Sequence, residues 1–283
     1  MTEEISAPKR PAQKLAVWGT VGEAYAVWFA NLGLWLKLSI VPVVILIGLK
    51  AIAPSAMSDA NSADAGAAGA AAAVFMLFAV IVYLSEIPLA TAWHRFILTH
   101  GDTTSHRYLV GRREWRYLLK ALLITLVILL VSLVIGLLMG AVLIPVILAG
   151  TEGGAVANLP WLGAATGFFT LLVYAALGYF LGHLFLMLPG AAIGRQISMK
   201  DTRAAVRGNE WRLIGVYIVA LLPIWIVGTI LTWPVDGTPV LSANDMLGHV
   251  PALFFAPVIV GVVSVSYREL VQKPEAAVGG IGG

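Results

Sequence analysis

The chain has 283 residues, of which 59% are hydrophobic and only 12% are charged. Average soluble domains carry about 25% charged residues, so this lower share is typical of a chain solvated mainly by lipid. The absence of cysteine excludes disulfides, thiolate catalysis and cysteine-based metal sites. The net charge of +3 does not indicate nucleic-acid binding, because the basic residues lie in loops beside apolar segments, where they favour anionic lipids.

An amphipathic segment precedes the first apolar span. Its apolar side chains recur at helical spacing, while Lys14, Thr20 and Glu23 fall elsewhere on the helix. The apolar positions are Leu15, Trp18, Val21, Tyr25, Trp28 and Leu32. We expect a helix in the headgroup plane, acting either as an elbow that positions the first span or as a surface for anionic lipid or a partner protein.

Six apolar segments are long enough to cross a bilayer, which takes about 20 residues per helix. They are residues 34–53, 71–93, 118–142, 162–190, 213–233 and 250–267. The predicted fold class is therefore all-α. We expect a polytopic membrane protein with a single integral domain over 1–283, built of six transmembrane helices and cytoplasmic interfacial amphipathic helices.

Lysine and arginine are absent from residues 51–94, 121–194 and 213–267, and they concentrate in the loops Arg95–Lys120 and Arg195–Arg212. Cytoplasmic loops retain basic residues, so both loops are predicted to be cytoplasmic. The proposed outer loops carry acidic residues and no basic ones. An odd number of crossings would put one basic block outside. Both termini are therefore predicted to be cytoplasmic, and the protein is predicted to lie in the cell inner membrane.

The third apolar run continues to Ala149. A helix over 118–149 would be about 48 Å long at 1.5 Å per residue, which exceeds the roughly 30 Å of bilayer hydrocarbon. Either this helix tilts strongly, or it breaks near Gly140 and Pro145 and ends along the outer interface.

Aromatic residues and glycine pairs indicate where the spans end and how they pack. Trp and Tyr favour membrane interfaces, and five of them are predicted near the inner boundary. These five are Trp35, Trp93, Trp115, Trp211 and Tyr267. G-x-x-x-G pairs allow helix backbones to approach closely, which predicts a seam between the third and fourth spans. The pairs begin at Gly136, Gly163 and Gly178.

The two basic loops share the tripeptide Glu-Trp-Arg just before an outgoing span. The residues are Glu114, Trp115, Arg116, Glu210, Trp211 and Arg212. A weaker echo precedes the first span, so three hairpin units are predicted. They cover residues 1–95, 96–195 and 196–283. In the third unit, Ser198 and Asp201 form an S-x-x-D capping box that predicts a helix start.

Basic residues at the ends of the predicted spans are the candidate contacts to membrane lipid. They are Arg95, Arg112, Arg113, Arg116, Arg203, Arg207 and Arg212. Membrane lipids are therefore the predicted partner, with a membrane-protein partner as a further candidate. The sequence does not define an oligomeric state.

Two polar residues fall inside apolar spans, where ionisable groups are costly. Glu86 lies nine residues before Arg95, and His183 lies twelve before Arg195, at a similar predicted depth. We expect the two side chains to be partners. One interpretation is a polar clamp between the second and fourth spans, and the other is a proton- or ion-coupled path.

No motif for catalysis, a metal or a cofactor is present. Nothing in the sequence resembles G-x-S-x-G, H-E-x-x-H or a P-loop. His94, His100 and His106 share one loop at a spacing of six, which rotates successive side chains by about 240° on a helix and suits a single metal poorly. The prediction is that the protein is not an enzyme and holds no metal or cofactor.

Three short segments resemble a known group of bacterial proteins. They read DTRAAVRGNEWRLIG at 201–215, EAYAVWFANL at 23–32 and WHRFIL at 93–98. They are similar to multi-pass inner-membrane proteins related to the membrane domain beside some glycerophosphodiester phosphodiesterases. The resemblance implies an inner-membrane helical bundle. It implies no catalytic residues here, because the phosphodiesterase active site of that family lies in a separate soluble domain.

Two functions fit these observations. The first is a non-enzymatic inner-membrane protein that acts as a scaffold or envelope factor through lipid or protein contacts. The alternative is a small proton- or ion-coupled transporter or permease with Glu86 and His183 in its path.

Overall fold

The structure is a computed structural model. It describes residues 14–60, 65–99, 101, 111–151, 173, 175–232, 234–235, 238–239 and 250–273. Predictions about His100, His106 and most of the acidic outer loops lie outside the described residues.

The described chain is helical apart from one very short hairpin. Its longer helices are α1 (Val17–Ala30), α2 (Leu32–Ala60), α3 (Ala65–Leu98), α4 (Arg112–Thr151), α8 (Glu210–Thr232) and α9 (Val250–Tyr267). The shorter elements are the 3₁₀ turn η2 (Gly182–Leu186), α6 (Met187–Ala192), α7 (Met199–Val206) and the π-helical turn η3 (Arg268–Gln272). Strands β1 (Pro234–Val235) and β2 (Thr238–Pro239) pair antiparallel.

Four described segments are long and apolar enough to cross a membrane. They are Met76–Leu98, Arg112–Leu138, Ala175–Ala192 and Phe255–Gln272. A fifth arises if Val17–Ala30 and Leu32–Gly48, which meet at 79°, count as one span. These segments overlap five of the six predicted spans. The remaining one, 213–233, overlaps α8, which is described only in part. The helices support a multi-pass membrane protein, with four to five spans among the described residues.

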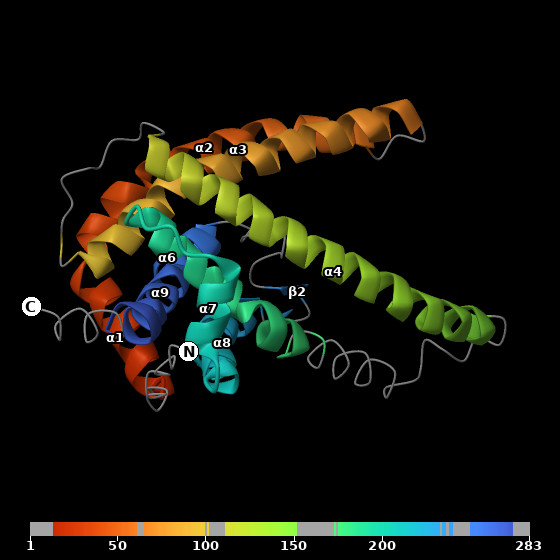
Figure 1. Cartoon of the computed structure of the whole chain (residues 1–283). Coiled ribbons are helices and arrows are strands. Elements are labelled where there is room, and N and C mark those ends of the chain that lie inside the picture. The colour runs from red at the N-terminus through yellow and green to blue at the C-terminus, as the bar shows by residue number, and fades with distance from the viewer. Residues whose placement is uncertain are drawn as a thin grey trace, which may run out of the picture.

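The buried core lies around α9, at one end of the molecule. Helix α9 contacts α1, α2, α3, α6 and α8, and Figure 1 shows it enclosed by these elements. Within Phe255–Gln272, 61% of the residues are buried, against 11% of the most apolar part of Arg112–Leu138. The last segment is therefore the centre of the bundle, whereas α4 presents most of its surface outward, as a helix facing lipid would.

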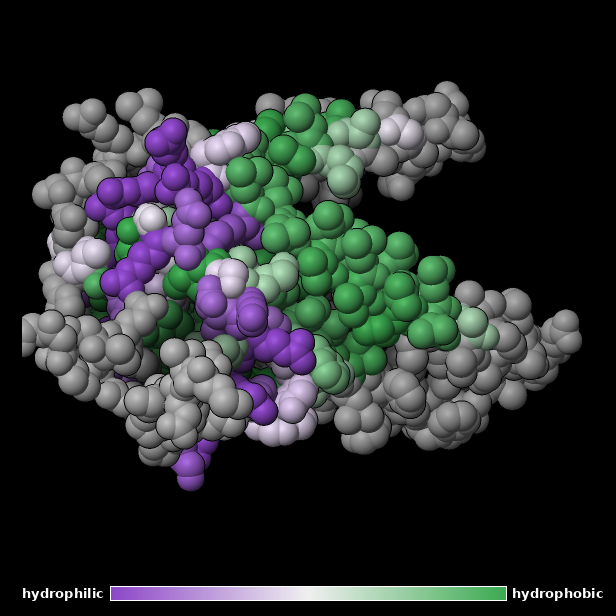
Figure 2. All heavy atoms as spheres, in the orientation of Figure 1, coloured by the Kyte–Doolittle hydropathy of each residue, from purple (hydrophilic) through white to green (hydrophobic). Residues whose placement is uncertain are grey.

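Away from this core, the helices separate. Helices α2 and α3 run side by side as a hairpin, and α4 diverges from them (Figure 1). The leucines along α4 are exposed, which suits lipid and not water as their surroundings. They include Leu122, Leu126, Leu129, Leu133 and Leu137. Figure 2 shows this hydrophobic surface over α4, with hydrophilic residues gathered at the end of the molecule where α4 begins.

Helix α4 decides between the two alternatives for the long third run. It is continuous from Arg112 to Thr151, through Gly140 and Pro145. Forty residues correspond to about 60 Å at 1.5 Å per residue. The break near these residues is therefore not observed, and a helix of this length fits a bilayer only when it is tilted or extends beyond it.

A buried polar cluster joins three helices at the core end. The Nδ1 atom of His94 lies 2.7 Å from Ser264 Oγ, and its Nε2 lies 3.2 Å from the Tyr117 hydroxyl. Ser264 donates its single proton to the Val260 carbonyl at 2.8 Å. Nδ1 therefore donates to Ser264, and Tyr117 donates to Nε2, which makes His94 a neutral and fully satisfied link. The cluster ties α3 to α4 and α9.

Helix α1 packs on the protein more than the amphipathic pattern predicts. Its residues Thr20, Val21, Ala24 and Trp28 are buried, and the helix contacts α8 and α9. Trp18 alone of the predicted apolar face is strongly exposed, at 75%. The assignment of Thr20 to the polar face was wrong, because that side chain lies against the core. The elbow interpretation agrees with the sharp bend between α1 and α2.

Three of the predicted boundary aromatics are core residues. Trp35 and Trp93 pack edge to face with ring centroids 5.2 Å apart, and both are fully buried, as is Tyr267. The Trp93 indole N–H donates to the Pro257 carbonyl at 3.0 Å. These three residues are therefore core aromatics, and their depth relative to the inner boundary stays a prediction. Trp115 and Trp211 are 54% and 68% exposed, as the predicted position at the inner boundary allows.

The glycine seam joins a different pair of helices from the predicted one. A Cβ atom at Gly178 would lie 3.3 Å from Ile214, and one at Gly182 would lie 3.6 Å from Tyr217. Both partners belong to α8. Gly136 has open space around it, so the described part of the seam lies between the fourth and fifth predicted spans. Gly163 lies outside the described residues.

Candidate functional site

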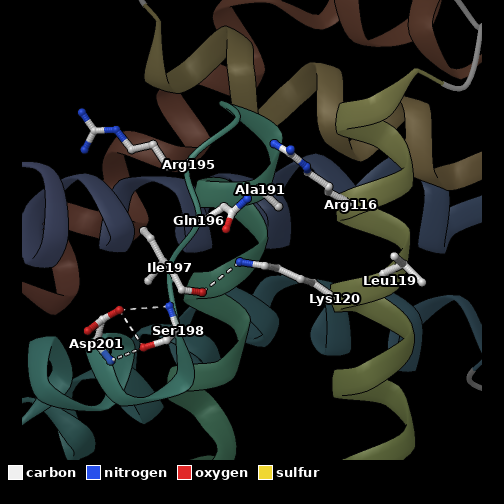
Figure 3. A pocket seen from close by; sticks show the side chains of 9 residues that line it. All are labelled: Arg116, Leu119, Lys120, Ala191, Arg195, Gln196, Ile197, Ser198 and Asp201. Carbon is white, nitrogen blue, oxygen red and sulfur yellow. Dashed lines mark hydrogen bonds between the residues drawn. The ribbon is translucent and has the colours of Figure 1, made fainter.

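A cationic pocket lies between the start of α4 and the connection from α6 to α7 (Figure 3). Its volume is about 400 Å³. It is lined by Arg116, Leu119, Lys120, Ala191, Arg195, Gln196, Ile197, Ser198 and Asp201. All of these residues except Ala191, which is in α6, come from the two basic loops that the charge pattern predicts to be cytoplasmic, so the fold brings the loops together at this point.

The first turns of α4 orient two of the cations. Glu114 accepts the backbone N–H of Gly111 at 3.0 Å, which satisfies a donor at the helix start. The carboxylate also suits the positive end of the helix dipole. Arg116 and Lys120 are four residues apart, so they lie on the same face of α4. That face is turned toward the α6–α7 connection (Figure 3).

The opposite wall is an extended segment held by two local devices. Gly194 has φ +83°, a left-handed conformation that glycine adopts without strain and that ends the turn after α6. Ser198 then caps α7: its Oγ accepts the Asp201 N–H at 3.2 Å, and the Asp201 carboxylate accepts the Ser198 N–H at 3.0 Å. The predicted capping box is thereby confirmed. Residues 195–198 are left extended between the two helices.

The carboxylate of Asp201 is committed to this cap. The Ser198 hydroxyl donates to it at 2.6 Å. This bond, with the one from the Ser198 backbone, lowers the pKa of Asp201 below its usual value. Asp201 is therefore ionised at neutral pH. It lies across the connection from Arg116 and Lys120 (Figure 3).

Lys120 connects the two walls. Its ammonium group donates to the Ile197 carbonyl at 2.9 Å. An ammonium group has three N–H donors, so two remain for another acceptor. Arg116 forms no hydrogen bond or ion pair within the described part of the chain. Its guanidinium extends over the pocket beside the Gln196 carboxamide (Figure 3).

The pocket lies on a boundary between polar and apolar surface. Leu119 is exposed between the two α4 cations in sequence, and the exposed leucines of α4 continue from it. Trp115, one turn earlier, is exposed as a residue at a membrane interface would be. The site can therefore hold an anionic group on its basic side while an attached chain lies along α4.

Of the predicted lipid-facing arginines, one lines this pocket, and that is Arg116. Arg95 is buried in the core. Arg112, Arg113, Arg203 and Arg207 are exposed and do not line it. Arg113 is close by, since its Nε would lie 3.7 Å from a Cβ placed on Gly194.

The two Glu-Trp-Arg copies lie at the starts of α4 and α8, but their arginines have different contacts. Glu210 accepts the Gly208 N–H at 2.9 Å, much as Glu114 accepts that of Gly111. Arg212 donates to the Leu15 carbonyl at 2.9 Å. The Leu15 N–H donates to Asn209 Oδ1 at 2.8 Å. In the third unit, the motif thus binds the backbone that leads into α1.

The structure does not join Glu86 to His183. Among the described residues, no hydrogen bond or ion pair links the two side chains. The Glu86 carboxyl has an electrostatic interaction with Tyr117 instead. His183, in η2, is close enough to Arg203 for an electrostatic interaction. The proposed partnership remains a prediction without a contact to support it.

Several site residues were missed by reasoning from the sequence. The sequence pattern does not single out Lys120, Arg195 or Gln196, although the first two mark the edges of the basic blocks. That edge position was the one available signal, because the edge of a basic block is where the headgroup layer begins. His94, which the sequence spacing relates only to metal binding, lies instead in the hydrogen-bonded cluster with Ser264 and Tyr117. In the described residues, no group of His, Asp and Glu could hold a metal ion.

No family model, curated protein or solved structure matches this chain.

Proposed function

We propose that this chain is a non-enzymatic protein of the cell inner membrane that binds anionic phospholipid at its cytoplasmic rim. It would act there as a scaffold or envelope factor. The observation that carries the proposal is the pocket in which Arg116 and Lys120 face the 195–198 connection beside the exposed apolar surface of α4.

The charge and position of the pocket support lipid as the ligand. Three cations and one carboxylate line it, and the cation Arg116 has no partner among the described residues. Juxtamembrane lysines and arginines each favour an anionic leaflet by about 1 kcal/mol. Both basic loops are cytoplasmic in the topology that the positive-inside rule predicts.

The alternative, a proton- or ion-coupled transporter, needs Glu86 and His183 to share a path. No contact between them supports it in the described residues. Membership of the family of membrane domains beside glycerophosphodiester phosphodiesterases also remains a proposal, supported by the short motifs alone.

The proposal is tested by lipid titration of the purified protein in a neutral detergent, with bound lipid counted by native mass spectrometry. Wild type should bind phosphatidylglycerol more tightly than phosphatidylcholine. The double substitution Arg116→Gln with Lys120→Gln should weaken phosphatidylglycerol binding about 30-fold, because it removes two cations at about 1 kcal/mol each.

The matched control removes one arginine and one lysine charge at residues that do not line the pocket. Arg112→Gln with Lys200→Gln changes two exposed residues on α4 and α7 that do not line it. The affinity of this control variant for phosphatidylglycerol should fall by less than about threefold. Equal losses in the two double variants would reduce the effect to general surface charge and would contradict the proposed site.

A further inference from the structure

The donors and charges of the pocket define its ligand more narrowly than a preference for any anionic lipid. We propose that it selects a phosphomonoester headgroup, as in phosphatidic acid, over the phosphodiester of other anionic phospholipids. This inference rests on the proposed function, because it assumes that the pocket faces the cytoplasmic leaflet.

The charge that faces the pocket matches a dianion. Arg116 and Lys120 extend toward the space and carry two positive charges, whereas the Arg195 side chain points away from them and the Asp201 carboxylate accepts from Ser198 (Figure 3). A phosphomonoester carries about −1.5 to −2 at neutral pH, whereas a phosphodiester carries about −1. The dianion neutralises the pocket, and the monoanion leaves one cation without a counter-charge.

The number of donors also fits a terminal phosphate. Arg116 presents a planar fork of N–H groups with no acceptor among the described residues, and Lys120 has two N–H groups left after its bond to Ile197. Figure 3 shows the Gln196 carboxamide extending toward the same space. A phosphomonoester offers three terminal oxygens to these three side chains, and a diester offers only two.

The apolar edge of the pocket indicates that the phosphate belongs to a lipid. Leu119 lines it, and the exposed leucines of α4 continue the apolar surface away from Arg116 and Lys120. Acyl chains attached to the bound phosphate would lie along this surface. A soluble phosphate would leave it unused.

In the third hairpin unit, the residues that correspond to Arg113 and Arg116 bind backbone groups of the same chain. There Arg212, the counterpart of Arg116, binds the Leu15 carbonyl, and Asn209 binds the Leu15 N–H. Asn209 corresponds to Arg113 in the second unit. At these two positions the second unit has two arginines, whereas the third unit has one arginine and one asparagine. Among the described residues, no backbone group is bound to Arg116. An anion suits this arrangement better than a peptide group does.

The test compares four probes on the purified full-length protein at pH 7.5: phosphatidic acid, phosphatidylglycerol, phosphatidylcholine and inorganic phosphate. Phosphatidic acid should bind at least about fivefold more tightly than phosphatidylglycerol, the effect of about one more charge. The preference should shrink toward unity at pH 5, because the second ionisation of the phosphomonoester occurs near pH 6. Asp201 stays ionised over this range, since its bonds from Ser198 lower its pKa.

The variants make the outcomes separable. Arg116→Gln with Lys120→Gln should abolish the preference for phosphatidic acid, and Arg112→Gln with Lys200→Gln should keep it. Equal binding of phosphatidic acid and phosphatidylglycerol, both above phosphatidylcholine, would overturn the phosphomonoester inference and leave the proposed function standing. Equal binding of all three lipids would overturn both. Displacement of phosphatidic acid by an equal concentration of inorganic phosphate would contradict the inference that the bound phosphate belongs to a lipid.

Discussion

At the residue scale, the positions that decide the fold are polar groups with satisfied bonds inside apolar surroundings. His94 uses both ring nitrogens, one toward Ser264 and the other toward Tyr117. A lipid-solvated bundle gains little from bringing one apolar helix against another, so hydrogen bonds and close packing specify which helices meet. The cluster is accordingly expected to fix α4 against α3 and α9.

Tyr117→Phe tests this link. The substitution removes the proton that His94 Nε2 accepts and leaves a buried acceptor unpaired, which costs about 1–3 kcal/mol. We expect the midpoint of thermal unfolding in detergent to fall by several degrees. Tyr179→Phe is the matched control, because the Tyr179 hydroxyl forms no hydrogen bond to any described residue. An unchanged midpoint for Tyr117→Phe would show that the cluster does not stabilise the bundle.

At the element scale, short local signals set the helix starts around the pocket. The capping box at Ser198 begins α7, and the glutamates of the two Glu-Trp-Arg copies bond to the backbone ahead of α4 and α8. These signals work within four residues, which is why the sequence alone located the capping box at Ser198. The wall of the pocket depends on the capping box, since residues 195–198 are extended only up to the point where α7 begins.

The stability of α7 is expected to depend on pH through Asp201. Its folded pKa is lowered by the bonds from Ser198, so the contribution of the cap is present above the unfolded pKa of about 3.9 and is lost as pH falls through the lower, folded value. Amide exchange over Met199–Val206, corrected for intrinsic rates, should therefore be steady from pH 7 to 5 and rise below about pH 4.

Substitution of the cap gives the same readout at neutral pH. Ser198→Ala should raise amide exchange in α7 several-fold at pH 7, because it removes the acceptor for the Asp201 N–H. Ser85→Ala removes a serine whose hydroxyl bonds within α3, and it should leave α7 unchanged. If α7 were as protected in Ser198→Ala as in wild type, the cap would not be what orders this wall.

At the scale of the whole molecule, hydrophilic residues gather at the end that holds the buried core, and the helices that diverge from it are apolar. This distribution is consistent with placement of the basic residues on one side of a membrane. Hydrophilic side chains gather where α4 begins (Figure 2), and the pocket lies at that end. The topology that the positive-inside rule predicts would put Arg203 in the cytoplasm and Asp236 outside.

Because the chain lacks cysteine, single cysteines can report this topology directly. In whole cells, a maleimide that does not cross the membrane should modify Asp236→Cys and should reach Arg203→Cys only after lysis. Labelling of Arg203→Cys in intact cells would show that the predicted orientation is wrong and that the pocket does not face the cytoplasmic leaflet. Both single-cysteine proteins should first match wild type in expression and membrane extraction.

The sequence by itself determined features that contiguous residues encode. Apolar runs, basic blocks and the Ser198–Asp201 cap are local patterns, and from them came the prediction of a helical membrane fold and the start of α7. Tertiary structure decided which helices meet. It buried Trp35 and Trp93, moved the Gly178 contact to α8, and set Lys120 against Ile197 across 77 positions of chain. Apolar helices of similar composition are nearly interchangeable as neighbours, so their pairing depends on side-chain shape and a few polar bonds between distant residues.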